Sequence, residues 1–347
     1  MEPLSLAANQ PPKFYRGGPQ IASFRGSPPD VRPLGSDDGF APEDWIASTV
    51  ASDGTESDGA TVLPDGTLLR DAIRADPLAY LSPAQYAAFG PNPGLLVKLL
   101  DAGERLPVHC HPDRAFASTH LGSAFGKTEA WLIVGTEGPD PHVYLGFNRD
   151  VELPELDKWF EEQDSVVILA AMNRVAVNVG DAILVPAGTP HAISAGVFIV
   201  ELQEPTDFSV MLEWKNFGMP ERHDAQLGMS VAQSLQCFNR RRLATDDIAD
   251  LHRRGGAGGE PGVTTLLPPS AAPFFQAEEV VVDGSHDLEA GYSILIVLDG
   301  AGTMRTADSS IDVARGSTVL IPYSAGTTTL RGQLRAIRCL PPASHGQ

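Results

Sequence analysis

The sequence is poor in cysteine and in positive charge, and both shortages limit what the protein can be. Its three cysteines, Cys110, Cys237 and Cys339, are odd in number and far apart, which argues against a disulfide framework and favours a reducing compartment. Lys and Arg number 25 against 44 Asp and Glu, so the formal net charge is −19. Because a surface this acidic repels phosphate backbones and anionic lipids, we expect neither nucleic acid nor a membrane as partner.

Long apolar runs are also missing. No uninterrupted apolar stretch approaches the roughly 20 residues of a transmembrane helix, and the N-terminal residues lack the apolar centre of a signal peptide. The 347 residues, 42% of them apolar, suffice for two domains that each bury a core. We therefore expect a cytoplasmic globular protein.

Short strands dominate the pattern. Apolar segments recur at intervals punctuated by turns, which indicates a mostly β fold of the sandwich or barrel type. Helical spacing is clear over 66–89 and 152–163, and weak over the polar stretch 216–255. The glycine-rich loop RRGGAGGEPG at 253–262 favours a domain boundary.

The chain contains an internal repeat. The segment GDAILVPAGTPHAI at 180–193 is echoed by GSTVLIPYSAGTTTL at 316–330, with the same spacing from glycine to proline. His191 of the first copy is replaced by Thr327 in the second. The repeat predicts two related barrels, only one of them equipped with histidines.

This pattern divides the chain into four predicted parts. We expect an N-terminal arm packed on the first barrel, a metal-binding barrel, a helical or loop connector and a second, metal-free barrel, over 1–60, 61–215, 216–262 and 263–347.

Four residues are candidate metal ligands: His109, His111, Glu129 and His191. The two histidines of VHCHPD lie at positions i and i+2, which share one face of a strand. Three imidazoles and one carboxylate suit a divalent first-row ion such as zinc, iron(II), manganese, nickel or cobalt. Each histidine alone could be an ordinary core or surface residue, but the set together favours a metal site.

These motifs carry a family resemblance. The stretches LLVKLLDAGERLPVHCHPD, GKTEAW and VPAGTPHAI, at 95–113, 126–131 and 185–193, resemble the type I mannose-6-phosphate isomerases of the cupin superfamily, particularly the short bacterial members. The resemblance implies two cupin barrels and one divalent ion, with zinc the leading choice, held by the four candidate ligands. His109 stands where this family normally has glutamine.

The resemblance also implies roles for three residues beside the metal. Lys127 matches a lysine that faces the substrate, while Glu201 and Asp207 match acidic positions that line the pocket. The alternation around Glu201 is compatible with a cavity face or a solvated face, and the resemblance favours the cavity. Met211 stands where the family has an arginine, a change that removes any electrostatic role.

Three functions follow from these observations. The first is a metal-dependent isomerase that interconverts an aldose and a ketose, either a sugar or a sugar phosphate, through a cis-enediol. The second is a metal-dependent cupin oxidoreductase or dioxygenase, because such enzymes use the same three histidines and one glutamate. The third is a sugar-binding homologue with impaired catalysis. The sequence leaves the oligomeric state open.

Overall fold

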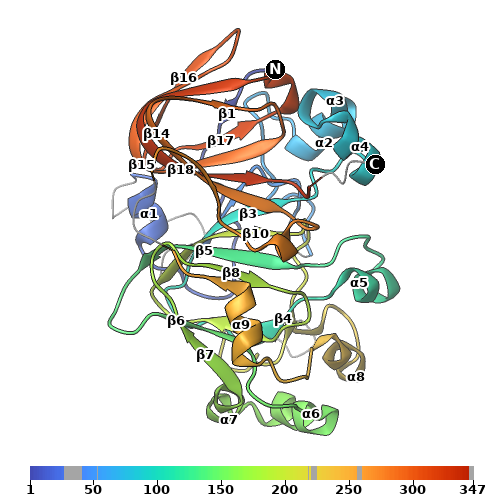
Figure 1. The fold of residues 1–347 in the computed structure, drawn as a ribbon. Coiled ribbons are helices and arrows are strands. Elements are labelled where there is room, and N and C mark those ends of the chain that lie inside the picture. The colour runs from blue at the N-terminus through green and yellow to red at the C-terminus, as the bar shows by residue number, and fades with distance from the viewer. Residues whose placement is uncertain (27–40, 53, 218, 220–224, 256–259, 344–347) are drawn as a thin grey trace.

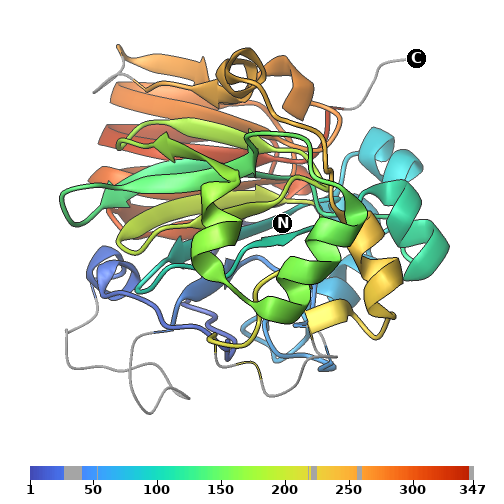
Figure 2. The same cartoon turned by 90° about the horizontal axis from the view of Figure 1, so that it is seen from below.

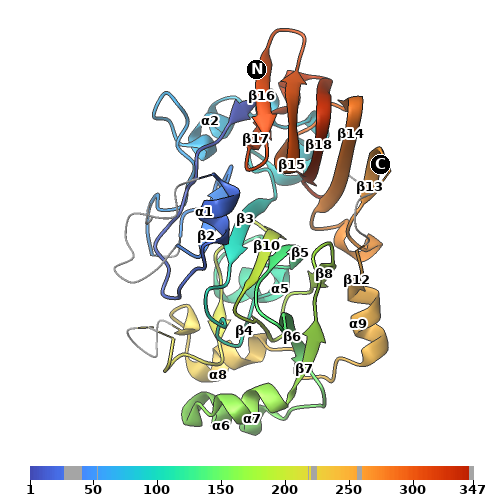
Figure 3. The ribbon, with the colours of Figure 1, turned by 90° about the vertical axis from the view of Figure 1, so that its left-hand side faces the viewer.

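Three antiparallel sheets lie one above another in the part of the chain that is described (Figures 1 and 3). The computed structural model describes residues 1–26, 41–52, 54–217, 219, 225–255 and 260–343. The first sheet combines residues 4–5 with strands between residues 262 and 340, and the middle and third sheets are built from strands between residues 43 and 253. The mostly β fold predicted from the sequence is confirmed.

The C-terminal sheet has seven strands. In spatial order they are β1 (Leu4–Ser5), β17 (Thr318–Ile321), β15 (Ser293–Arg305), β18 (Thr328–Leu340), β14 (Gln276–Leu288) and β13 (Gly262–Thr265), with β16 (Ser310–Ala314) paired to β15.

The strands between residues 43 and 253 form one sheet of six strands and one of five. The middle sheet runs β12 (His252–Arg253), β8 (Ala182–Val185), β5 (Glu129–Thr136), β10 (Val197–Gln203), β3 (Leu96–Asp101) and β2 (Glu43–Ile46). The third sheet runs β11 (Val210–Met211), β4 (His109–Cys110), β9 (His191–Ile193), β6 (His142–Phe147) and β7 (Met172–Ala176).

The internal repeat has a structural counterpart. In the middle sheet the order is β8-β5-β10-β3, and in the C-terminal sheet the corresponding order is β17-β15-β18-β14. Strands β8 and β17 belong to the two copies of the repeat, and they occupy the same position in their sheets. This matching order supports the two related cupin barrels that the sequence predicted.

Strand β10 shows how the layers are held together. Its residues Phe198, Val200 and Leu202 are buried in a core that also contains Ile294 and Ile337 of the C-terminal sheet. The residues between them point the other way, because successive side chains of a strand alternate. One face of the middle sheet therefore joins the two barrels, and the other face lies toward the third sheet.

The predicted helical stretch 66–89 forms three short helices, α2 (Leu69–Ala75), α3 (Pro77–Tyr80) and α4 (Pro83–Phe89). Each break has a local cause: Pro77 and Pro83 begin new helices, and Asp76 and Ser82 cap them through side-chain hydrogen bonds. No helix of the described chain is long and apolar enough to cross a bilayer.

The remaining helices surround the sheets. Helix α6 (Leu153–Glu162) was predicted, and with α7 (Ser165–Ala170) it lies at the end far from the C-terminal sheet (Figures 1 and 2). The others are α1 (Gln20–Phe24), α5 (Arg114–His120), α8 (Val231–Ser234) and α9 (Thr245–Leu251), with 3-10 turns at Leu235–Cys237, Pro269–Ala271 and Tyr323–Ala325.

The N-terminal arm contacts both halves of the molecule. The sequence predicted an arm packed on the first barrel, and β2 does pair with β3 there. Strand β1, however, pairs with β17 of the second barrel, which the sequence did not predict. A two-residue strand carries too little periodic pattern to reveal its partner.

Candidate metal centre and adjoining cavity

A cavity of about 410 Å³ lies between the middle sheet and the third sheet. It is lined from one side by residues of β3, β5 and β10, from the other by residues of β4, β9 and β11, and at one end by the N-terminal arm. A volume of this order is typical of small-molecule sites. All seven site residues predicted from the sequence line this one cavity: His109, His111, Lys127, Glu129, His191, Glu201 and Asp207.

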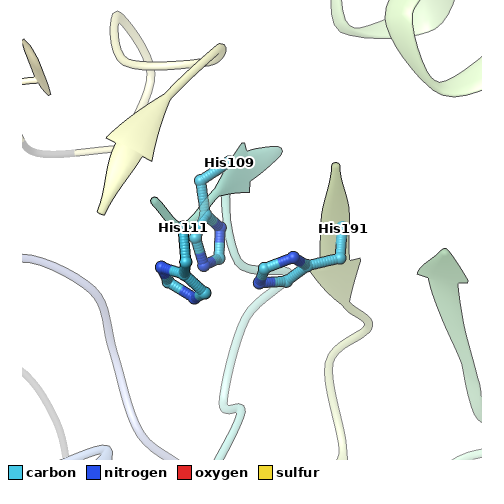
Figure 4. A group of neighbouring side chains, drawn as sticks. All are labelled: His109, His111 and His191. Atoms are coloured by element: carbon cyan, nitrogen blue, oxygen red, sulfur yellow. The ribbon is translucent and has the colours of Figure 1, made fainter. Parts of the chain in front are cut away.

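The three histidines converge inside the cavity (Figure 4). His109 of β4 is paired with His191 of β9 across the ladder, so their rings lie on one face at a centroid distance of 4.2 Å. The ring of His111 lies 4.9 Å from that of His109 and 4.8 Å from that of His191. One nitrogen from each ring falls within 4.8 Å of the others, which suits a shared cation.

Backbone carbonyls fix the tautomer of all three rings. The Nδ1 atoms of His109, His111 and His191 donate to the carbonyls of Pro107, Phe208 and Thr189 at 2.8, 2.7 and 2.8 Å. Since a carbonyl oxygen can only accept, each Nδ1 carries the proton and each Nε2 keeps its lone pair. Metal-binding histidines in proteins are oriented in this way.

Glu129 lies against two of these lone pairs. Its Oε2 is 3.0 Å from Nε2 of His111 and its Oε1 is 3.3 Å from Nε2 of His191. Nevertheless Oε2 of Glu129 and Nε2 of His191 are buried without a hydrogen-bond partner. Unsatisfied buried polar atoms are rare and costly, and a metal ion would satisfy both. The residues present therefore fit a divalent cation.

The protonation states agree with this fit. Burial lowers the pKa of His111 to about 3 and that of His191 to about 4, and it lowers the pKa of His109 well below its ordinary value. Burial alone would raise the pKa of Glu129, but His111 and Lys127 hold it well below its ordinary value. Near neutral pH the set is three neutral imidazoles and one carboxylate, the forms that bind a metal.

Lys127 and Glu201 adjoin the four candidate ligands. Nζ of Lys127 is 3.0 Å from Nε2 of His111 and 3.5 Å from Oε2 of Glu129. Glu201 of β10 lies in register with Lys98 on one side and Trp131 on the other. Burial raises the pKa of Glu201 to about 8, with a further contribution from the neighbouring charge of Glu129.

A buried charge network in the lining of the cavity was not predicted from the sequence. Nζ of Lys13 lies 3.1 Å from Asp207 and 3.7 Å from Glu43, and Nζ of Lys98 lies 3.8 Å and 3.3 Å from the same carboxylates. Both ammonium groups also lie over the ring of Trp45, at 4.6 and 4.7 Å from its centroid.

The network holds Asp207 as a carboxylate. Burial would raise the pKa of Asp207, but Lys13 and Lys98 lower it below its ordinary value. A lysine inside the apolar strand LVKLL was a signal for Lys98, because a charge in a buried strand requires partners. Lys13 gave no such signal, since the arm has no periodic pattern.

Met211 lies beside the histidines. It is paired with His109 across β11 and β4, as His109 is with His191, so the three side chains form one row on one face. Met211 is 7% exposed and lines the cavity together with Met219 and Leu227. This wall is apolar.

Comparison with known proteins agrees with the fold and the motifs. Residues 267–341 match the family model described as the cupin domain of mannose-6-phosphate isomerase. The chain is 27% identical over 245 residues to mannose-6-phosphate isomerase ManA of Bacillus subtilis, which covers 70% of this chain and 73% of that protein. A protein from Streptococcus mutans with the name mannose-6-phosphate isomerase is 28% identical over 245 residues, 70% of this chain and 72% of its own.

Solved structures extend the likeness to nearly the whole chain. A crystal structure of the mannose 6-phosphate isomerase from Bacillus subtilis matches with a TM-score of 0.70 and 18% identity, over 98% of this chain and 99% of that one. A mannose 6-phosphate isomerase bound with zinc and yttrium matches with a TM-score of 0.69 and 13% identity, over 99% and 100%. The motifs, the relatives and the fold agree: this chain resembles the type I mannose-6-phosphate isomerases and has their cupin fold.

Proposed function

We propose that this protein is a metal-dependent isomerase that interconverts an aldose and a ketose through a cis-enediol, with a sugar or sugar phosphate as substrate. The observation that carries the proposal is the convergence of His109, His111, His191 and Glu129 in one cavity with further acidic and basic side chains. Such a cavity can bind a polyol, and its charged groups can move a proton between neighbouring carbons.

Zinc is the metal we propose for this site. Three imidazole nitrogens and one carboxylate suit zinc, and a family structure with zinc supports the choice for this chain. When bound, the ion would polarise the substrate oxygens at C1 and C2 and favour the negative charge that develops there. His109, His111, Glu129 and His191 would hold it.

We assign the proton transfer to the two carboxyl groups that line the cavity. Asp207 is kept ionised by Lys13 and Lys98, so it can accept a proton from carbon. Glu201 lines the cavity in register between Lys98 and Trp131 and can exchange a proton with a substrate oxygen. Lys127 can donate a hydrogen bond to an oxygen of the substrate beside the metal.

The four-part division of the chain is part of this proposal, with 61–215 as the metal-binding domain and 263–347 as the metal-free one. We also propose a cytoplasmic location, which the three free, buried cysteines support.

The test is a metal-controlled turnover assay. The purified protein is stripped with a chelator, reloaded with zinc, manganese or iron(II), and incubated with aldoses and their phosphates under an oxygen electrode. Ketose formation that needs the metal and consumes no oxygen supports the proposal. Oxygen consumption with iron would support the oxidoreductase instead, and sugar binding with no turnover would support an inactive homologue.

A further inference from the structure

We infer that Glu204 and Glu213 are positioning residues that hold two of the four candidate metal ligands in place. This inference rests on the proposed function, because it names residues that shape the same metal site. It follows from one hydrogen-bonding arrangement that occurs twice in the structure, once beside Glu129 and once beside His109.

Glu204 holds the residue that precedes Glu129. Its Oε2 accepts a hydrogen bond from the backbone N–H of Thr128 at 3.0 Å, and its own N–H donates to the carbonyl of Thr128 at 3.1 Å. Thr128 lies between Lys127 and Glu129 in the sequence. Because both backbone polar groups of Thr128 are bound, the backbone that carries its two neighbours is restrained as well.

Glu213 makes the same arrangement one residue before His109. Its Oε2 accepts from the backbone N–H of Val108 at 2.7 Å, and its own N–H donates to the carbonyl of Val108 at 3.0 Å. Glu204 directly follows β10 of the middle sheet, whereas Glu213 follows β11 of the third sheet. The same pair of hydrogen bonds therefore occurs beside a candidate ligand in each of two sheets.

An arginine neutralises each carboxylate. Nε of Arg114 lies 2.5 Å from Oε1 of Glu204, and the two Nη atoms of Arg105 lie 2.6 and 2.9 Å from the carboxylate of Glu213. Both glutamate side chains are 1% exposed, while those of Arg114 and Arg105 are 40% and 23% exposed. Since the arginines reach water, they can lose a partner at lower cost than the buried backbone N–H groups can.

The ligand-bearing segments are also bonded to each other. The backbone N–H of Lys127 donates to the carbonyl of Pro112, one residue past His111, at 2.9 Å. Neither glutamate belongs to the cavity lining that the structure describes, so each would act through the ligand beside it. Residues that orient metal ligands without touching the metal commonly change its affinity by about 10- to 100-fold.

The experiment separates the reach of the side chain from its charge. Competition with a chelating dye measures the zinc affinity of the full-length protein without any turnover. Glu204→Gln keeps an acceptor at the same reach, so the affinity should stay within about threefold of the wild type, whereas Glu204→Asp keeps the charge but is one methylene shorter and should bind zinc at least about tenfold more weakly.

The same two substitutions at Glu213 repeat the test beside His109, with the same expected results, and decide it if a variant of Glu204 does not fold. Equal affinities of the Asp variants and the wild type would overturn the inference. So would Gln variants that lose as much affinity as the Asp variants, because charge and not reach would then govern the site.

Asp181 supplies the control for a general loss of stability. It is a buried carboxylate that accepts from the backbone N–H groups of Asn178 and Gly255, both at 3.0 Å, and neither of these residues adjoins a candidate ligand. Asp181→Ala should lower stability in urea and leave zinc affinity within about threefold of the wild type. A loss of zinc affinity in Asp181→Ala as large as in Glu204→Asp would contradict a specific positioning role.

Turnover separates this inference from the proposed function. Zinc affinities that follow the expected order, with no sugar isomerised, would support the inference and refute the isomerase. Isomerisation by the wild type, with zinc affinity unchanged in both Asp variants, would refute the inference and support the isomerase. A wild type that binds no zinc would overturn the inference.

Discussion

Nζ of Lys13 lies 3.1 Å from Oδ2 of Asp207, although 194 positions separate the two residues in the chain. The ion pair joins the N-terminal arm to the lining of the cavity, and Lys98 approaches the same carboxylate from β3. The arm is thus part of the site and not only a cover for it.

Removing the ammonium group of Lys13 should destabilise the folded protein. In Lys13→Met the buried carboxylates of Asp207 and Glu43 share one lysine, so the free energy of unfolding should fall by about 3 kcal/mol. Urea unfolding followed by tryptophan fluorescence measures it. The exposed Lys215→Met is the matched control and should change stability by less than about 0.5 kcal/mol. A Lys13→Met protein as stable as this control would contradict a structural role for the pair.

Substitutions of His109 and His111 should affect metal binding differently. His111→Ala should lose the metal, because it removes the Nε2 that faces Glu129 at 3.0 Å. His109→Gln should keep it, since an amide oxygen can replace an imidazole nitrogen as ligand. Metal content after dialysis, measured by mass spectrometry, decides both, with the exposed His120→Ala as control. Loss of metal from His109→Gln would show that the geometry of this site depends on the imidazole.

Metal removal should weaken the fold. An ion bound to the folded chain would satisfy the buried Oε2 of Glu129 and Nε2 of His191, so a chelator should lower the melting temperature by several degrees. The same chelator should not change the melting temperature of His111→Ala. Equal chelator effects on the two proteins would place the stabilising ion elsewhere.

Asp101 should make stability depend on pH. Burial raises its pKa from 3.8 to about 6, although Gln20 donates to it through the backbone and side-chain amides at 2.6 and 3.0 Å. The folded state then binds the proton more tightly than the unfolded state, so stability should fall as pH rises through this interval.

The measurement compares the wild type with Asp101→Asn by urea unfolding at several pH values between 3.8 and 6. The wild type should lose roughly 2 kcal/mol relative to the variant across this range. The exposed Asp150→Asn should run parallel to the wild type. A constant difference between the wild type and Asp101→Asn would contradict the raised pKa.

The sequence predicted the structure best where the spacing of residues along the chain determines where their side chains lie. The histidines of VHCHPD, at i and i+2, do reach one cavity, although His111 lies just beyond the end of β4. The repeat likewise predicted two barrels, since strands that echo each other take matching places in their sheets.

Contacts between residues far apart in the chain could not be predicted from the sequence. Lys13 and Glu43 belong to an arm without periodic pattern, and only the fold brings them to Lys98 and Asp207. The pairing of β1 with β17 is similar, since it joins the two ends of the chain. Contacts of this kind depend on the assembled sheets and leave no local signature.

The most direct test of the proposed isomerase measures the exchange of carbon-bound hydrogens of the sugar for deuterium. The zinc-loaded protein is incubated in D2O with aldoses and aldose phosphates in turn, and proton NMR records the carbon-bound hydrogens. A cis-enediol route predicts ketose with deuterium at C1, aldose that gains deuterium at C2, and neither in His111→Ala. Absence of both metal-dependent ketose and exchange, with every aldose and aldose phosphate, would contradict the isomerase.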